Sequence, residues 1–272
     1  AMIAHFNWQW DDWDKLASGI VAGHLLECGT QVTGGNFTDW QKVKNFKNMG
    51  FPIVEVREDG RFLLTKHPGT GGLVSCDTVR EQLFYEMGDP KSYISPDVVC
   101  DFSSVKLKSL EKEDTVEVYG VRGSPATSSY KVSMAYHGGY KASGQLLISG
   151  PEALKKAKAF AEIFWQRASS DLFETHSEFC GWNSCHRSLS FCEEPSEIVL
   201  QLSAKSFNKK HLVHFKRLIS SLILSGPPGV CVLAGGARIS EIMSYWPALL
   251  PKNFVHPHIS LYKEAEELES LK

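Results

Sequence analysis

No run of apolar residues in this sequence is long enough to cross a membrane. A membrane-spanning helix needs about 20 consecutive, predominantly apolar residues, and no stretch of the 272 residues comes near that length. The chain start, residues 1–5, has neither the basic region nor the apolar core of a signal peptide. The last three residues, Ser270-Leu271-Lys272, differ from the peroxisomal tripeptide. We therefore expect no membrane partner.

The sequence also lacks an excess of charge of either sign and a disulfide framework. Its 29 basic and 31 acidic residues leave a formal net charge of −2, and no basic stripe interleaved with aromatic residues appears. Nucleic-acid binding depends on such a positive field and is therefore excluded. Seven cysteines is an odd number in a chain of ordinary size, which favours reduced thiols and a cytoplasmic location.

What the sequence does contain is enough apolar and aromatic bulk for a packed core. With 43% hydrophobic and 22% charged residues, its composition is near the average of soluble globular proteins. Seven Trp, fifteen Phe and eight Tyr supply large side chains for that core. The length suits one large domain or two small ones.

The first part of the chain predicts helices alternating with short strands. Apolar residues recur at helical spacing from Trp13 to Cys28, and the helix should end near Gly29. Two strands at 53–56 and 62–65 flank an Asp-Gly turn, which predicts a hairpin. The other expected elements are a short amphipathic helix from Trp40 to Lys47, a helix capped by Ser75 or Asp77 that runs to Glu86, a strand at 97–102, and paired strands at 105–107 and 115–119.

The second part predicts helices on one face of a mixed or antiparallel sheet. A loop at Arg122–Pro125 is the best internal boundary, and a β-β-α-β-α-β order follows it. The expected elements are strands at 130–136 and 141–149 around a turn at His137–Gly139, a helix at 151–169, a strand at 198–204, a helix at 209–224, and strands at 230–234 and 255–261. The predicted fold is therefore α/β (α+β), with an N-terminal α/β portion at 1–125, an α+β sandwich at 126–262 and an acidic tail at 263–272.

A glycine-rich loop at 68–72 lies between a predicted strand and a predicted helix. Backbone N–H groups in such loops, with the dipole of the following helix, hold anions. The pattern matches neither the P-loop nor the dinucleotide fingerprint. The loop predicts a site for a phosphate, a carboxylate or the diphosphate of coenzyme A; the alternative is a tight connection that merely needs glycine. The residues assigned to this anion site are Lys66, His67, Gly69, Thr70, Gly71 and Gly72.

The segment from Gly23 to Phe37 concentrates groups that can carry chemistry. Glu27 can act as a general base, with His24 or Cys28 as its proton partner, or His24 can activate Cys28 as a nucleophile. However, a thiol at a helix C-terminus is poorly placed for a low pKa. The spacing of His24 and Cys28 also fits a packing role on the apolar face of the helix. The turn that follows adds three predicted substrate-binding residues, which are Gly34, Gly35 and Asn36.

Three further features resemble sites more weakly. A cluster of His176, Cys180, Cys185, His186 and Cys192 lacks the C-x₂-C spacing of zinc knuckles, so we expect no metal. His256 and His258 flank a proline and predict an edge strand rather than a ligand pair. Asp101 ends an apolar strand, where functional residues often lie, although a strand-end cap is the simpler interpretation.

Seven runs of this sequence carry a resemblance to a known family. They are residues 6–17, 22–29, 33–37 (Thr33-Gly34-Gly35-Asn36-Phe37), 66–72 (Lys66-His67-Pro68-Gly69-Thr70-Gly71-Gly72), 85–90, 97–102 and 130–133. With these runs the chain resembles the AtuA-like (acyclic terpene utilisation) family, long catalogued as a domain of unknown function. The resemblance covers most of residues 5–262 and is strongest in the first 135.

The resemblance implies a larger domain and a class of substrate. Family members carry a long α/β segment before the point that aligns with His5, so this chain looks like the C-terminal part of the family domain. If that segment supplies half of the active site, this chain alone is expected to be inactive. Bacterial relatives belong to pathways that degrade acyclic terpenoids and branched acids as acyl-CoA thioesters, and their proposed role is carbon–carbon lyase chemistry.

Three functional hypotheses follow from these observations. The leading one is part of an enzyme, without a cofactor, that acts in a lyase-like reaction on branched or terpenoid acyl-CoA-type substrates. Its expected partner is a small-molecule substrate such as a CoA thioester. The second is a non-catalytic module that binds an anion or another subunit. The third is a scaffold that only assembles into a homo-oligomer.

Overall fold

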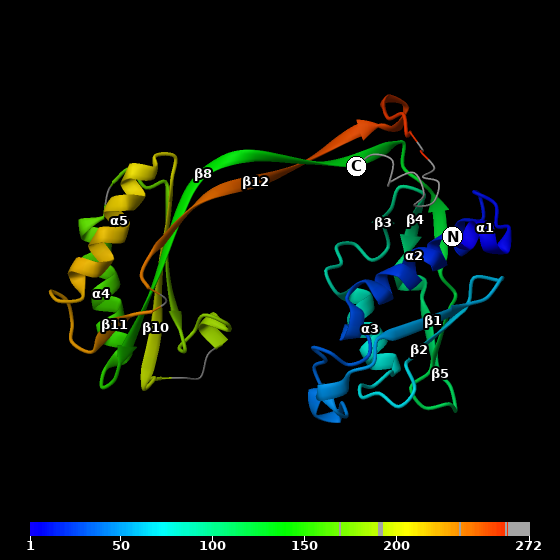
Figure 1. Cartoon of the computed structure of the whole chain (residues 1–272), viewed down its shortest axis with the longest axis horizontal. Coiled ribbons are helices and arrows are strands. Elements are labelled where there is room, and N and C mark those ends of the chain that lie inside the picture. The colour runs from blue at the N-terminus through cyan, green and yellow to red at the C-terminus, as the bar shows by residue number, and fades with distance from the viewer. Residues whose placement is uncertain (169, 190–192, 234, 259, 261–272) are drawn as a thin grey trace, which may run out of the picture. The chain divides into compact units, whose positions relative to one another are not determined.

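The chain forms two compact units, which are described separately below. The computed structural model describes residues 1–168, 170–189, 193–233, 235–258 and 260. Unit 1 comprises Ala1–Tyr130 together with the chain from Leu249, and unit 2 comprises Lys131–Ala248 (Figure 1). The predicted acidic tail at 263–272 lies outside the described residues. Within the described part of the chain, no helix is long and apolar enough to cross a membrane.

In its described residues, unit 1 combines three α-helices with two small antiparallel sheets. Its helices are α1 (Met2–Phe6), α2 (Trp13–Glu27) and α3 (Cys76–Phe84). One sheet has the order β1-β2-β6-β5, with strands Pro52–Val56, Phe62–Lys66, Val116–Tyr119 and Lys106–Ser109. The other has the order β3-β4-β7, with strands Tyr93–Ile94, Val98–Asp101 and Arg122–Pro125.

Local sequence signals account for most of unit 1. The apolar stripe of α2 is buried as the spacing predicts, with Val21 and Leu25 fully inside the core. Strands β1 and β2 form the expected hairpin. Ser75 caps α3 in a capping box with Thr78, although the helix ends before Glu86. Strands β5 and β6 pair as predicted.

The predicted helix from Trp40 to Lys47 is wrong. The chain instead makes two short 3₁₀ turns, η2 (Trp40–Lys42) and η3 (Phe46–Asn48). The segment between them is extended, because the Lys44 carbonyl accepts a hydrogen bond from the Gly72 N–H at 2.7 Å. Asn45 is in the left-handed region, with φ of 53°, which a helix interior does not allow.

The predicted loop at Arg122–Pro125 is also wrong, because these residues form β7 and pair with β4. Gly123 explains the difference. A Cβ at this position would overlap the Trp13 carbonyl, so glycine lets the strand approach the start of α2 directly. The glycine that resembles a loop signal in the sequence is therefore a close-packing residue.

Unit 2 is a five-stranded antiparallel sheet with two helices. The strand order is β11-β8-β10-β9, and β12 also pairs with β8. The strands are β8 (Ser129–Ser149), β9 (Glu174–Cys180), β10 (Glu197–Ser206), β11 (Val230–Val232) and β12 (Arg238–Pro251). The helices are α4 (Ala153–Arg167) and α5 (Lys209–Leu222), and their extents agree closely with the prediction.

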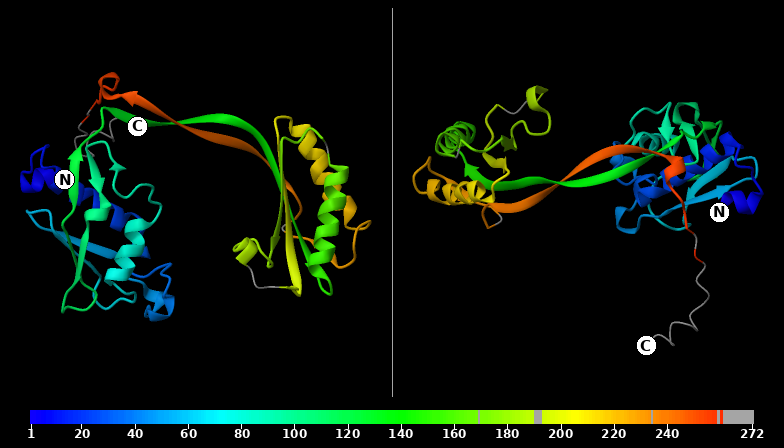
Figure 2. Two further views of the ribbon diagram at one scale, coloured as in Figure 1. Left: turned by 180° about the vertical axis from the view of Figure 1, so that it is seen from behind. Right: turned by 90° about the horizontal axis from the view of Figure 1, so that it is seen from above.

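Both helices cover the same face of the unit 2 sheet, as predicted (Figure 2). Alternate β10 residues from Ile198 to Ala204 are buried against α4 and α5. The core between the layers includes Phe160, Phe164 and Phe215. The opposite face of β10 carries Gln201, Ser203 and Lys205, and no helix in the described part of unit 2 covers it.

Three strand predictions in this half are wrong. Residues 130–149 form one continuous strand without a turn at His137–Gly139. A Cβ at Gly138 would overlap the Ser244 hydroxyl, so this glycine makes room for β12 rather than for a turn. Strand β9 was missed, because the sequence predicted no strand at residues 174–180. The late strand is β12, while residues 255–258, predicted to begin a strand, lie outside any strand.

Candidate functional site

The end of α2 places His24 in a packing role between two helices. The His24 Nε2 atom lies 3.0 Å from the Gln82 carbonyl, and Gln82 Nε2 donates to the His24 carbonyl at 3.1 Å. The imidazole also packs edge-on against Phe102 and Tyr93, with ring centroids 5.2 and 5.9 Å away. These contacts join α2 to α3, to β3 and to the residue that directly follows β4. The structure therefore favours the packing interpretation of His24.

Cys28 and Glu27 form a hydrogen-bonded pair at the surface. The Cys28 thiol donates to Glu27 Oε2 at 2.9 Å, and the Glu27 carboxylate is exposed. Because the carboxylate accepts a hydrogen bond from the neutral thiol, the pKa of Cys28 is raised above its ordinary value. The neutral thiol is a poor nucleophile. Of the three predicted catalytic groups, Glu27 has the geometry most open to a substrate.

The two predicted glycine turns lie directly against each other. The Leu73 N–H donates to the Thr33 carbonyl at 2.8 Å, and a Cβ at Gly72 would lie 2.7 Å from the same carbonyl. Gly34 and Gly72 have φ values of 102° and 99°, which favour glycine. Segments about 40 residues apart in the sequence are thus brought together in one corner of unit 1.

The amide groups of this corner are mostly occupied within the chain. The Gly71 N–H donates to the Asn48 carbonyl and the Gly72 N–H to the Lys44 carbonyl, each at 2.7 Å. The Gly35 N–H donates to the Thr30 carbonyl at 2.9 Å. An anion needs N–H groups that point away from protein acceptors. These three amides therefore hold the fold together instead of facing a ligand.

Lys66 is likewise committed to the interior of unit 1. Its side chain is 8% exposed and lies 2.8 Å from the Asp114 carboxylate, and its Nζ donates to the Thr70 carbonyl at 2.9 Å. Asp114 in turn accepts the Val74 N–H at 2.8 Å. The charge of Lys66 is thus neutralised. Of the residues predicted to bind an anion or a substrate in the two glycine turns, His67, Gly69 and Asn36 are exposed.

Asp101 caps the strand in which it lies. Its Oδ1 accepts the Ser103 N–H at 2.9 Å and the Ser103 hydroxyl at 2.5 Å, which starts the 3₁₀ turn η4 (Phe102–Ser104). Both bonds are local. The structure favours the strand-end cap over a substrate contact.

The described histidines and cysteines of the second cluster are spread over β9 and the turns after it. His176 and Cys180 lie on β9, Cys185 lies in the turns after it, and Cys192 lies outside the described residues. Among the residues that the structure describes, no three His, Cys, Asp or Glu side chains are grouped so as to hold a metal ion.

A serine–histidine–aspartate arrangement occurs at the start of α5. Ser206 Oγ lies 3.1 Å from His211 Nδ1, and His211 Nε2 lies 3.6 Å from the Asp171 carboxylate. However, Ser206 is 1% exposed, and its Oγ accepts the Asn208 N–H at 3.1 Å. A buried hydroxyl that holds a helix start is inaccessible to a substrate, so this arrangement stabilises the fold.

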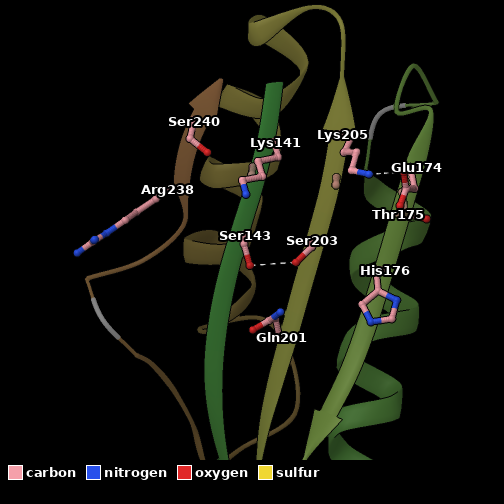
Figure 3. A pocket seen from close by; sticks show the side chains of 12 residues that line it. Lys141, Ser143, Glu174, Thr175, His176, Gln201, Ser203, Lys205, Arg238 and Ser240 are labelled. Atoms are coloured by element: carbon pink, nitrogen blue, oxygen red, sulfur yellow. Dashed lines mark hydrogen bonds and ion pairs between the residues drawn. The ribbon is translucent and has the colours of Figure 1, made fainter. Parts of the chain in front are cut away.

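The uncovered face of the unit 2 sheet contains a polar cavity of about 320 Å³ (Figure 3). We call it the open-face cavity. Polar side chains line it in cross-strand rows. Lys205 is directly opposite Lys141 on one side and Glu174 on the other, and Ser203 is likewise opposite Ser143 and His176. Because directly opposite residues share a face of an antiparallel sheet, these side chains project together.

The open-face cavity is predominantly positive. Its lining residues include Lys141, Lys205 and Arg238 but a single carboxylate, Glu174. Glu174 pairs with Lys205 at 2.6 Å. Within the described part of the chain, Lys141 and Arg238 have no ion pair of their own. Lysines directly opposite each other in a sheet are unfavourable, which is a physical reason to expect an anion here.

Hydroxyl and amide groups in the same cavity are ordered by hydrogen bonds. The Ser143 and Ser203 hydroxyls lie 2.9 Å apart, and Gln145 Nε2 donates to Gln201 Oε1 at 2.9 Å. Ser240 and His176 add further polar groups at the cavity wall (Figure 3). The lining thus combines hydroxyl groups with cationic side chains, and both kinds of group can bind an oxyanion.

The sequence prediction missed this cavity because it depends on strand pairing. Lys141 and Ser143 alternate with buried residues, as do Ser203 and Lys205, and this period of two was the available signal. Two errors hid it. The sequence predicted no strand at 174–180, and it predicted a turn at the glycines before Lys141, where β8 is continuous.

Comparison with known proteins gives one match. Residues 1–261 match the family described as acyclic terpene utilisation family protein AtuA. No curated protein and no solved structure matches the chain.

Proposed function

Because the chain belongs to the acyclic terpene utilisation family, we propose that it forms part of an enzyme with lyase-like action on branched or terpenoid acyl-CoA-type substrates. In this proposal the open-face cavity binds the anionic part of the substrate. The observation that carries it is the presence of three cationic side chains, Lys141, Lys205 and Arg238, and only one carboxylate among the residues that line this cavity.

The chemistry of the cavity suits a phosphate-bearing ligand. A guanidinium such as that of Arg238 can bind two phosphate oxygens at once, while lysine ammonium groups act as point charges. The Ser143 and Ser203 hydroxyls lie beside these charges and can donate to further oxygens. An acyl-CoA thioester carries such phosphates, and its acyl group would extend beyond them.

The proposal predicts that the full chain binds inorganic diphosphate and CoA through Lys141 and Arg238. A Lys141→Gln/Arg238→Gln variant should bind both at least about tenfold more weakly, because one charge-assisted hydrogen bond contributes about 1.5–3 kcal/mol and about 1.4 kcal/mol corresponds to a factor of ten. Isothermal titration calorimetry at low and high salt measures the effect, and added salt should weaken binding.

A matched control removes two exposed charges elsewhere in unit 2. Lys216 and Arg217 lie on the exposed side of α5, so Lys216→Gln/Arg217→Gln changes the net charge equally without touching the cavity. It should leave both affinities unchanged. Equal weakening in the two variants, or no binding of either ligand to the original chain, would contradict the proposal.

A non-catalytic binding module is the second candidate. One observation favours it, namely that two of the three predicted catalytic groups are poorly suited to catalysis. The pKa of the Cys28 thiol is raised, and His24 packs between α2 and α3. Only Glu27 remains as an accessible base. Incubation with a branched acyl-CoA thioester, followed by mass spectrometry of the products, separates the two. Turnover that Glu27→Gln abolishes supports the enzyme, turnover that it retains removes Glu27 from catalysis, and binding without turnover supports the module.

A further inference from the structure

Two exposed phenylalanines form a stacked pair at one end of the unit 2 sheet. The rings of Phe173 and Phe207 have centroids 4.7 Å apart and an interplanar angle of 23°. Phe173 is 49% exposed and Phe207 73% exposed. Two large apolar rings that stack in solvent leave apolar surface in water, which is unfavourable unless another flat group covers it.

The stacked pair borders the positive row of the open-face cavity. The Phe173 N–H donates to the Lys205 carbonyl at 3.1 Å, and Phe207 follows Lys205 by two residues. A Cβ at Gly139 would lie 3.3 Å from Phe207 Cδ1, so this ring reaches across to β8 two residues before Lys141. The rings and the two lysines therefore share the end of the sheet where β10 finishes.

An aromatic face beside cationic side chains is the combination that binds nucleotides. Aromatic side chains stack on nucleobases, because every base has a flat π-face, and positive side chains hold the phosphates. Glu174 lies between the two features, next to Phe173 and opposite Lys205. A carboxylate in such a position can accept a hydrogen bond from a ribose hydroxyl.

We propose that Phe207, supported by Phe173, is a stacking platform for the purine base of a nucleoside diphosphate group whose phosphates bind Lys141 and Arg238. This inference rests on the proposed anion site and specifies the ligand that it takes. The same adenosine diphosphate group occurs in free nucleotides and at one end of CoA. A stacked base should strengthen binding about tenfold or more relative to diphosphate alone.

The test compares the affinities of the full chain for ADP and inorganic diphosphate. We expect ADP to bind about tenfold or more tightly than diphosphate. In Phe207→Ala this ratio should fall to about one, while the affinity for diphosphate stays unchanged. Phe207→Tyr, which keeps an aromatic face, should retain the preference for ADP. As a control, Leu224→Ala removes another exposed apolar side chain of unit 2 and should change neither affinity.

The outcomes separate this inference from the proposal on which it rests. If diphosphate binds through Lys141 and Arg238 but ADP binds no better, the platform is wrong and the anion site stands. If neither ligand binds, the anion site itself fails. A concentration-dependent dimer that Phe207→Ala dissolves, with the ADP preference intact, would assign the rings to a protein contact and overturn the inference. Tighter binding of CoA than of ADP would support the platform and indicate that the natural ligand is a CoA derivative. Equal binding of CoA and ADP would support the platform and indicate a free nucleotide.

Discussion

At the scale of single residues, the buried pair of Lys66 and Asp114 dominates the glycine corner of unit 1. The two side chains are 8% and 20% exposed, and they lie 2.8 Å apart. Each also takes a backbone partner, the Thr70 carbonyl for Lys66 and the Val74 N–H for Asp114. A lysine next to a glycine-rich loop suggests a ligand contact in the sequence, yet here it fixes the loop to the sheet.

We predict that Asp114→Asn destabilises the protein by about 3–5 kcal/mol, because it leaves the Lys66 ammonium buried without a counter-charge. Asparagine keeps an oxygen for the Val74 N–H and tolerates the φ of 53° at this position, so the lost charge is the main change. Urea unfolding of the original and variant chains measures the difference.

The neighbouring exposed pair provides the control for this prediction. Lys44 and Glu113 lie 3.3 Å apart with side chains 81% and 82% exposed. Glu113→Gln should change the free energy of unfolding by at most about 1 kcal/mol, because solvent screens exposed pairs. A Lys66→Met/Asp114→Asn double variant should recover much of the loss. Similar small effects of Asp114→Asn and Glu113→Gln would show that Lys66 does not depend on its buried partner.

The sequence identified the residues that carry reactive groups, but it did not predict which residues they contact in the fold. His24 contacts Gln82, which is 58 positions away, and this long-range contact gives the imidazole its packing role. Asp101 bonds to a residue two positions on, so its capping role was already a stated alternative. Local roles can be read from spacing, whereas roles set by distant partners depend on the fold.

At the scale of secondary-structure elements, glycine positions decide how closely elements approach. Gly123 places β7 against the start of α2, where a Cβ would overlap the Trp13 carbonyl. Gly144 of β8 similarly faces Ile219 of α5, where an added Cβ would lie 2.5 Å from the isoleucine Cδ1. Both glycines lie inside strands, where they are otherwise unfavourable.

We predict opposite effects for two Gly→Ala variants in unit 1. Gly123→Ala should destabilise the chain by about 1–3 kcal/mol, because an added methyl group has no space between β7 and α2. Gly23→Ala lies on the exposed side of α2 with nothing within 4 Å of the new Cβ, and should stabilise by up to about 1 kcal/mol. Thermal unfolding of the two variants measures whether each one is more or less stable than the original chain. A Gly123→Ala protein as stable as the original would contradict the close approach of β7 to α2.

The distinction between local signals and close packing explains which elements could be predicted from the sequence. The β1–β2 hairpin and the capped α3 depend on residues close in sequence, and both were predicted. Strand β7 and the unbroken β8 contain glycines that usually mark loops, so close packing was mistaken for turns. The open-face cavity needed β8, β9 and β10 paired in register, which no local pattern contains.

At the scale of the whole molecule, the two units have separate hydrophobic cores. The core of unit 1 includes Leu64, Val79 and Val116, and the core of unit 2 includes Phe164 and Leu202. The two clusters share no residue among those described. The sequence predicted an internal boundary near Pro125, whereas the division lies at Tyr130 and the chain re-enters unit 1 at Leu249. That return depends on β12, which the sequence prediction did not contain.

Separate cores predict that the units lose stability independently. Leu64→Ala and Leu202→Ala each remove a fully buried side chain, one in each core, and each should cost about 2–5 kcal/mol. Differential scanning calorimetry should resolve two transitions, and each variant should lower the midpoint of one while the other stays within about a degree. The two variants control for each other, because they make the same chemical change at equally buried sites.

A single transition that both variants lower equally would mean that the chain unfolds as one cooperative unit. In that case, a destabilising change in unit 1 would also lower the fraction of chains in which the open-face cavity is folded. Independent transitions would instead allow the cavity variants of unit 2 to be interpreted as local effects on binding.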